Sequence, residues 1–153
     1  MPLLTNNQYR KIVVESIGAI RDRYKLKLIG YVLMPEHVHI VLVPPEEVKL
    51  GPVIGKLKIL SSKGIHELMQ NSNSPLMKRL IVTRNKNNNF VFWQRRCYDH
   101  NCRDAESVWE KVNYCHNNPV KRGLVSEPQN WVWSSYRYYA GYKQVMLKMD
   151  IAG

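Results

Sequence analysis

The chain has 153 residues, of which 44% are hydrophobic, and a chain of this length can bury most of its nonpolar surface in one core. We therefore expect a single domain over residues 1–153. No hydrophobic run approaches the roughly 20 residues of a membrane-spanning helix, so no membrane partner is expected. The first residues lack the basic-then-hydrophobic order of a secretory signal, so we expect the protein in the cytoplasm. The 23 Lys and Arg against 12 Asp and Glu give a net charge of +11, which favours a nucleic-acid partner but specifies no activity.

The first part of the chain predicts a helix followed by two strands. Residues 7–24 carry hydrophobic side chains at helical spacing after a polar cap region at 5–7. Residues 26–34 are expected to be extended. Residues 37–43 are rich in β-branched side chains and are followed by two prolines, as expected of a strand that proline terminates. The two strands are therefore predicted to form a hairpin.

A second helix is expected to begin at Pro52 and to end at the polar residues 71–75. Its predicted buried stripe follows the helical repeat at Ile54, Leu57, Leu60, Gly64, Ile65 and Leu68. A short hydrophobic piece at 76–82 leads to a polar loop at 84–89, and residues 90–93 are expected to form another strand.

A third helix is predicted to run through Ser107 to Asn117. Asp104 can cap its start, and its end is expected near Asn118 because Pro119 follows. The C-terminal tail is aromatic and basic. Helices and strands thus alternate in one α+β unit that has no internal repeat and no linker.

Two histidines on the second predicted strand point to metal chemistry. His37 and His39 are separated by one residue, so their side chains leave the same face with Cα atoms about 6–7 Å apart. Val38, Ile40 and Leu42 are expected on the opposite, buried face, which leaves the histidines on a surface that water or substrate reaches. Two imidazoles so placed can bind one cation, whereas either one alone is more simply explained by a hydrogen bond to a backbone carbonyl.

The third predicted helix supplies a candidate nucleophile. Tyr114 and Asn118 are four residues apart and share one helix face, while Val108, Val112 and Cys115 form another, hydrophobic face. The alternative for the tyrosine is ordinary amphipathic surface, and Asn-Pro also commonly begins a turn. A carboxamide oxygen nevertheless suits Mg²⁺ or Mn²⁺. A phosphotyrosine stores bond energy that hydrolysis would lose, so a tyrosine beside a metal favours strand transfer over degradation.

Four blocks follow one another along the chain: MPEHVHIV at 34–41, FWQRRCYDH at 92–100, YCHNNPVKRGL at 114–124 and WVWSSY at 131–136. They resemble the REP-associated tyrosine transposase branch of the single-tyrosine HUH transposases, whose motif is His-hydrophobic-His. The resemblance covers nearly the whole chain. It implies a ferredoxin-like or RRM-like antiparallel sheet with helices on one face. The strand that usually precedes the first helix is not evident, so either the sheet lacks it or the start is truncated.

The resemblance also implies roles for individual residues. His37, His39 and Asn118 are the expected ligands of a divalent metal, Mg²⁺ or Mn²⁺, and Tyr114 is expected to form a 5′-phosphotyrosine link to single-stranded DNA beside a hairpin. The expected activity is metal-dependent DNA cleavage and strand transfer. The alternatives are a catalytically inactive, domesticated protein that binds DNA hairpins and, less favoured, a basic RNA-binding module. The sheet edge that a missing strand would expose predicts a homodimer.

Side chains near the blocks are candidates for DNA contacts. The cations that flank the proposed site in sequence, and could contact phosphates, are Arg95, Arg96, Arg103, Lys121 and Arg122. Trp133, Tyr136 and Tyr138 could stack on unpaired bases, although packing in the core is the favoured interpretation for each aromatic.

Overall fold

The computed structural model describes residues 3–84, 86–93, 97–99 and 105–151, and these residues have the expected α+β class. The helices are α1 (Asn7–Tyr24), α2 (Leu50–Asn71), α3 (Ala105–Lys121) and the short α4 (Tyr136–Tyr139). The strands are β1 (Lys27–Leu33), β2 (Val38–Val43), β3 (Ile81–Arg84), β4 (Asn87–Phe90) and β5 (Cys97–Asp99). Among the described residues no strand precedes α1. None of the helices in these ranges combines the length and the hydrophobicity needed to cross a membrane.

Helix α1 begins where its cap region predicts. The side chain of Asn6 accepts hydrogen bonds from the backbone N–H groups of Gln8 and Tyr9 at 2.8 and 3.3 Å, which satisfies two donors that the start of a helix leaves unpaired. Lys25 follows the last turn in the left-handed conformation, with φ of 57°, and its N–H donates to the carbonyl of Arg21. Both ends of α1 are therefore set by local contacts.

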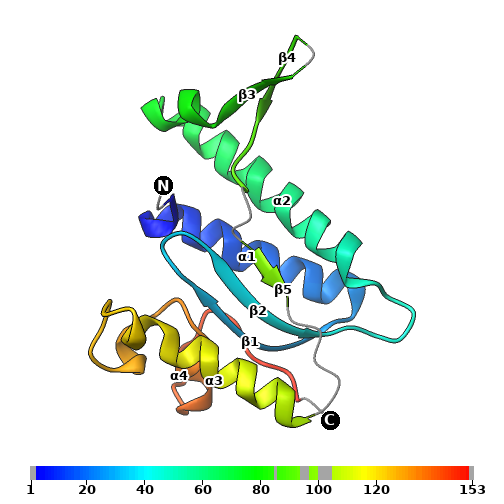
Figure 1. The fold of residues 1–153 in the computed structure, drawn as a ribbon, viewed down its shortest axis with the longest axis vertical. Coiled ribbons are helices and arrows are strands. Elements are labelled where there is room, and N and C mark those ends of the chain that lie inside the picture. Colours follow the sequence, from blue (N-terminus) through cyan, green and yellow to red (C-terminus); the bar gives the residue numbers. More distant parts are fainter. Residues whose placement is uncertain (1–2, 85, 94–96, 100–104, 152–153) are drawn as a thin grey trace.

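Strands β1 and β2 form the predicted antiparallel hairpin, with Lys27 opposite Val43 and Leu33 opposite Val38. Strand β5 pairs with the other side of β2 in parallel, so the sheet order is β1-β2-β5. The sheet is therefore mixed, whereas the resemblance implied a wholly antiparallel sheet. Strands β3 and β4 form a separate antiparallel pair that projects beyond α2 in Figure 1.

Helices cover both faces of the three-stranded sheet, so the expectation of helices on one face is wrong. On one face α1 and α2 enclose the main core, which includes Val38, Ile40 and Leu42 as predicted. The other face is covered by α3 (Figure 1). There Val41 of the sheet joins a second core cluster with Val112 of α3. The physical reason is that β1 is buried from its second residue onward and β2 over nearly its whole length, so both faces of these strands need a cover.

Helix α3 continues past Asn118, so the helix end predicted from Pro119 is also wrong. The proline lies inside the helix, which ends at Lys121. Proline removes one N–H donor, a small loss so close to the end of a helix. The N–H of Arg122 still donates to the carbonyl of Asn118 at 2.9 Å, and Gly123, with φ of 74°, terminates the helix.

The middle of the chain differs from the sequence expectations in detail. Helix α2 begins at Leu50, two residues before Pro52. Most of the polar segment 84–89 belongs to β3 and β4, and only the first residue of the strand expected at 90–93 belongs to β4. Cross-strand pairing thus overrides the weak strand preference of asparagine. Asp104, the expected cap of α3, lies outside the described residues.

The C-terminal tail covers the outer edge of β1. The N–H of Leu33 donates to the carbonyl of Trp133, and the N–H of Asp150 donates to the carbonyl of Leu28, each at 2.8 Å. The homodimer was predicted because a sheet edge was expected to be exposed. At Leu28 and Leu33 the tail already pairs the edge of β1. The homodimer itself stays a prediction, because the structure of a single chain does not test it.

Candidate metal and nucleophile site

Two histidines lie together where β2 begins. His39 belongs to β2 and faces α3, because alternate residues of the strand point into the main core. His37 precedes the strand in the turn after β1, and the two ring centroids are 4.7 Å apart with the planes at 89°. The imidazoles are adjacent, as the spacing predicts. His39 is only 7% exposed, however, so it lies beneath α3 and not on the open surface that we expected.

Helix α3 brings the candidate nucleophile to the same place. The ring centroid of Tyr114 lies 5.2 Å from that of His39 in the same chain, with the planes at 84°. The phenol is 47% exposed, so it borders solvent while it contacts a buried imidazole. Asn118, one helical turn later, is only 6% exposed. Residues from an early strand and a late helix thus meet at one point.

The carboxamide of Asn118 fits the role of a metal ligand. Its Nδ2 is buried and has no hydrogen-bond partner among the residues that the structure describes. A buried donor without an acceptor is costly. A half-turn of the terminal amide group exchanges the positions of its nitrogen and its oxygen. In that orientation Oδ1 takes the place of Nδ2, and oxygen is the ligand atom that Mg²⁺ and Mn²⁺ favour. The described part of the chain holds no group of three or more His, Cys, Asp or Glu suited to a metal. The candidate donor set at this point is two imidazoles and this amide.

Glu36 and Arg122 border the histidines. Arg122 Nη1 donates a hydrogen bond to Glu36 Oε1 at 2.5 Å, and the same oxygen lies 3.2 Å from His37 Nδ1. Burial lowers the pKa of His37, and the Glu36 carboxylate opposes that effect. Burial acts to raise the pKa of Glu36, but the hydrogen bond and charge of Arg122 lower it overall. Sequence reasoning missed Glu36; its position beside His37 was the available signal, since carboxylates commonly orient metal-binding imidazoles.

A further buried histidine connects α3 to the tail and to β1. His116 Nε2 lies 2.7 Å from Ser135 Oγ, which also accepts a hydrogen bond from the N–H of Tyr31 at 3.1 Å. Burial lowers the pKa of His116 to about 4, so this ring is neutral near pH 7. No spacing pattern in the sequence links these residues, and the contact was not predicted. It holds the helix that carries Tyr114 against the sheet.

The predicted DNA-contacting cations have different outcomes. Arg95, Arg96 and Arg103 lie outside the described residues. Lys121 is exposed at the end of α3. Arg122 is also exposed but forms the ion pair with the carboxylate in the turn after β1. Of the five, Lys121 is therefore the described side chain that remains available for a phosphate.

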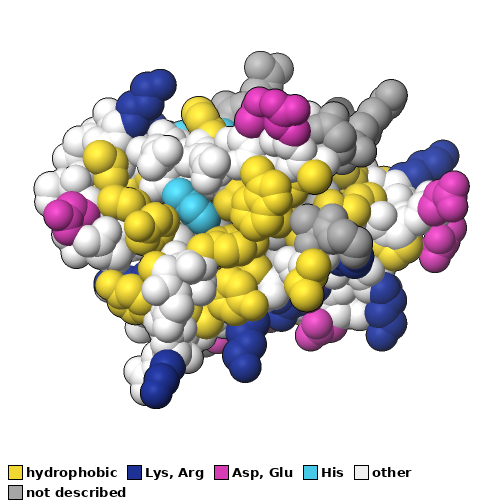
Figure 2. Space-filling view, turned by 90° about the horizontal axis from the view of Figure 1, so that it is seen from below, with side chains coloured by type: hydrophobic (Ala, Val, Ile, Leu, Met, Phe, Trp, Pro, Cys, Tyr) yellow, Lys and Arg dark blue, Asp and Glu magenta, His cyan; other side chains and the backbone are white. Residues whose placement is uncertain are grey.

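Most predicted stacking aromatics belong to the fold. Trp133 and Tyr138 pack against the main core, which confirms the favoured interpretation, and the ring of Tyr136 lies 5.4 Å from that of His116. Figure 2 shows the face seen from below, where α3 and α4 lie in Figure 1, with hydrophobic side chains gathered across it and Lys and Arg mainly towards its edges. The exposed large hydrophobic side chains of α3, α4 and the tail include Trp109, Tyr114, Tyr139, Tyr142 and Met146.

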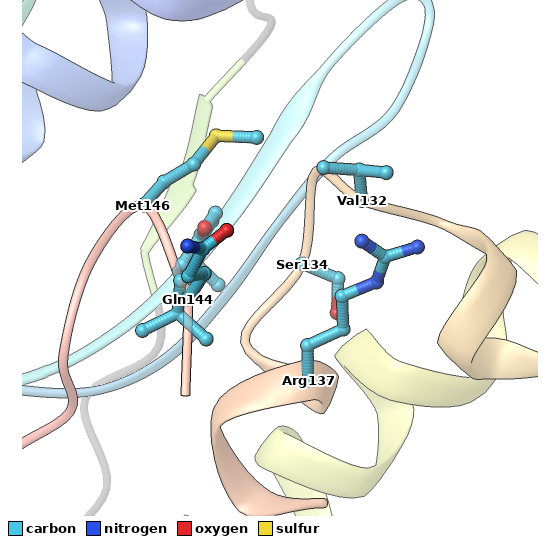
Figure 3. A pocket seen from close by; sticks show the side chains of 7 residues that line it. Val132, Ser134, Arg137, Gln144 and Met146 are labelled. Atoms are coloured by element: carbon cyan, nitrogen blue, oxygen red, sulfur yellow. The ribbon is translucent and has the colours of Figure 1, made fainter. Parts of the chain in front are cut away.

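A cavity of about 240 Å³ lies between β1 and the tail, apart from the candidate site. Its lining consists of Tyr31, Val132, Ser134, Arg137, Gln144, Val145 and Met146. Figure 3 shows the guanidinium of Arg137 turned towards Val132. Arg137 Nε donates to the carbonyl of Gln129 at 2.8 Å, and its guanidinium carbon lies 5.2 Å from the ring centroid of Tyr142. No predicted catalytic or metal-binding residue belongs to this lining.

Comparisons with known proteins agree with the sequence blocks. Residues 2–118 match the family model described as "Transposase IS200 like". A Haemophilus influenzae protein, provisionally named a REP-associated tyrosine transposase, is 25% identical over 115 residues, which cover 75% of this chain and 61% of that protein. The REP-associated tyrosine transposase of Escherichia coli strain K12 is 26% identical over 133 residues, which cover 87% of this chain and 67% of that protein. The chain thus spans about two thirds or less of these relatives. No solved structure matches it.

Proposed function

This chain belongs to the IS200-like transposase family, in the REP-associated tyrosine transposase branch, and from that we propose that it cuts and rejoins single-stranded DNA beside a hairpin. Tyr114 is the proposed nucleophile, and His37, His39 and Asn118 are the proposed ligands of Mg²⁺ or Mn²⁺. The observation that carries the proposal is the 5.2 Å separation of the Tyr114 and His39 rings, which puts a phenol beside a candidate metal ligand.

The proposed reaction exchanges one phosphate ester for another. The hydroxyl oxygen of Tyr114 attacks phosphorus, and the bond between phosphorus and the DNA 3′ oxygen breaks. The phenol loses its proton and the leaving oxygen gains one, so the products are a 5′-phosphotyrosine and a free 3′-hydroxyl. When bound, a divalent metal supplies Lewis-acid polarisation of the scissile phosphate. A DNA 3′-hydroxyl can later attack the phosphotyrosine and reseal the strand.

The exposure of the site residues determines where DNA can approach. His39 and Asn118 are almost completely buried, whereas the phenol of Tyr114 reaches solvent. A DNA strand can therefore reach the proposed nucleophile from the solvent side of α3.

The rings of Tyr114 and His39 that lie 5.2 Å apart belong to the same chain, which supports the proposal that Tyr114 serves the histidines of its own chain. A mixture of His37→Ala and Tyr114→Phe proteins tests this. If each chain supplies its own tyrosine, neither protein in the mixture can form a covalent DNA adduct. An adduct from the mixture would show that subunits exchange the tyrosine.

Adduct formation tests the proposed function directly. A labelled oligonucleotide with a hairpin and a single-stranded flank, incubated with the protein and Mn²⁺, should give a band of protein mass on a denaturing gel. Tyr114→Phe should abolish this band, while Tyr142→Phe, which alters a similarly exposed tyrosine at 43% against 47%, should retain it. An adduct with Tyr114→Phe would assign the nucleophile elsewhere. Hairpin binding that resists EDTA, without any adduct from the unmodified protein, would instead favour the inactive hairpin-binding alternative.

A further inference from the structure

The carboxylate of Glu36 joins the two segments that build the candidate site. Glu36 lies in the turn between β1 and β2, and its Oε1 contacts both Arg122 Nη1, at 2.5 Å, and His37 Nδ1, at 3.2 Å. Arg122 directly follows α3, the helix that carries Tyr114. One side chain therefore contacts the histidine turn and the nucleophile helix together.

The contact with Glu36 determines which nitrogen of His37 carries the lone pair that a metal would bind. A neutral imidazole has one N–H and one lone pair, and the N–H belongs on the nitrogen that faces a hydrogen-bond acceptor. Because Nδ1 faces the carboxylate, the lone pair lies on Nε2. Metal-binding imidazoles usually have their second nitrogen held in this way by a carboxylate, a carbonyl or water.

The contact with Arg122 restrains the last turn of α3. The N–H of Arg122 donates to the carbonyl of Asn118 at 2.9 Å, so the two residues belong to the same turn. Gly123 ends the helix immediately afterwards. A restraint on Arg122 therefore limits how far Asn118 moves from the turn that carries His37.

We propose that Glu36 is a positioning residue that holds His37 and Asn118 in place for one metal ion, and that Arg122 acts through Glu36 and not on DNA phosphates. This inference rests on the proposed function, since it concerns the same metal site. Both side chains of the Glu36–Arg122 pair are at least 36% exposed, and ion pairs of this exposure add little to folding stability. The effect of the pair is therefore expected on the geometry of the ligands.

Manganese affinity measured without DNA tests the role of Glu36. By isothermal titration calorimetry, Glu36→Ala should weaken Mn²⁺ binding about 10- to 100-fold, as loss of such outer contacts typically does. The thermal midpoint should stay unchanged. Glu36→Gln keeps an acceptor oxygen and should recover most of the affinity. Nitrogen NMR of the metal-free protein should show His37 protonated at Nδ1, and a mixture of tautomers in Glu36→Ala. Unchanged affinity and an unchanged tautomer in Glu36→Ala would overturn the proposal.

A double-mutant comparison tests the role of Arg122. If Arg122 acts through Glu36, adding Arg122→Ala to Glu36→Ala should cause no further loss of Mn²⁺ affinity. Arg122→Ala alone should leave hairpin affinity in EDTA unchanged. Lys121→Ala is the matched control, because it removes the same charge from the adjacent, exposed position. A loss of hairpin affinity in Arg122→Ala with no loss of Mn²⁺ affinity would make Arg122 a phosphate contact and overturn its assignment.

The unmodified protein in the same titration separates this proposal from the proposed function. If it binds Mn²⁺ and forms the adduct while Glu36→Ala behaves identically, the positioning role is overturned and the proposed function stands. If it binds no Mn²⁺, the proposed metal site is overturned and the role of Glu36 with it.

Discussion

Gly30 in β1 lies against α3, and its replacement by alanine tests how closely the helix packs on the sheet. A Cβ at this position would lie 3.0 Å from Cγ2 of Val112 and 3.4 Å from Ser135 Oγ. Carbon atoms pack best at roughly 3.5–4.0 Å, so Val112, and with it this part of α3, would have to give by a few tenths of an ångström. Overpacking of this kind costs about 1–3 kcal/mol. For a chain of this length each kcal/mol lowers the thermal midpoint by roughly 2–4 °C.

The same movement should slow the proposed reaction, because α3 carries Tyr114 and Asn118. A misplacement of about 1 Å can cost roughly 100-fold in rate, so a shift of a few tenths of an ångström should slow adduct formation by roughly three- to tenfold. Thermal melts followed by circular dichroism give the midpoint, and a denaturing gel gives the adduct rate. The rate is measured well below the midpoint, where the variant is folded.

Gly64→Ala is the control on the opposite face of the sheet. A Cβ there would lie 2.9 Å from Cγ2 of Ile12, where α1 and α2 meet. Its effect on the midpoint should be smaller, since alanine is favoured over glycine by about 1 kcal/mol inside a helix. Its adduct rate should equal that of the unmodified protein. Gly30→Ala with an unchanged midpoint and an unchanged rate would refute the close packing of α3 on β1.

Four further predictions concern the site and the assembly. Asn118→Ala should weaken Mn²⁺ binding, whereas Asn117→Ala, which changes the exposed neighbour, should not. Equal Mn²⁺ affinities of the two variants by calorimetry would remove the Asn118 amide from the ligand set. Burial lowers the pKa of His116 to about 4 from 6.5, so the unfolded chain takes up a proton at a higher pH than the folded chain. The free energy of unfolding should therefore fall as pH falls from 6.5 towards 4, and it should fall less steeply in His116→Gln. Denaturant titrations at several pH values measure this free energy. The same dependence on pH in both proteins would contradict a buried neutral ring. Lys121→Ala should reduce the slope of log hairpin affinity against log salt by about 0.7, and an unchanged slope would remove Lys121 from the DNA contacts. Light scattering at micromolar concentration should give the mass of a homodimer, and a monomeric mass would refute that prediction.

Features that depend on neighbouring residues could be predicted from the sequence. The Asn6 side chain binds N–H groups two and three residues away, so a cap and the start of α1 follow from local composition. The spacing of His37 and His39 predicts adjacent imidazoles for the same reason. The four-residue spacing of Tyr114 and Asn118 likewise predicts a shared helix face.

Features that depend on distant segments could not be predicted in this way. Glu36 and Arg122 are 86 residues apart, and neither spacing nor composition indicates that they meet. Burial of His39 depends on α3, which the resemblance placed on the same face as the other helices. A signal for the second covered face was present, because residues 28–34 form an almost unbroken hydrophobic run, which is typical of a strand buried on both sides. The position of Pro119 inside α3 was also not predictable, because the helix ends two residues later and loses little from the missing N–H.

The match to the family model stops at Asn118, yet β1 depends on residues beyond that point. The backbone groups of Leu28 and Leu33 bond to Asp150 and Trp133, so residues 2–118 alone would lack these partners. Expressed by itself, it should form aggregates through the bared strand, much as unprotected β-strands polymerise. The part of the chain that the family model matches is therefore shorter than the part that the sheet needs to pair its edge.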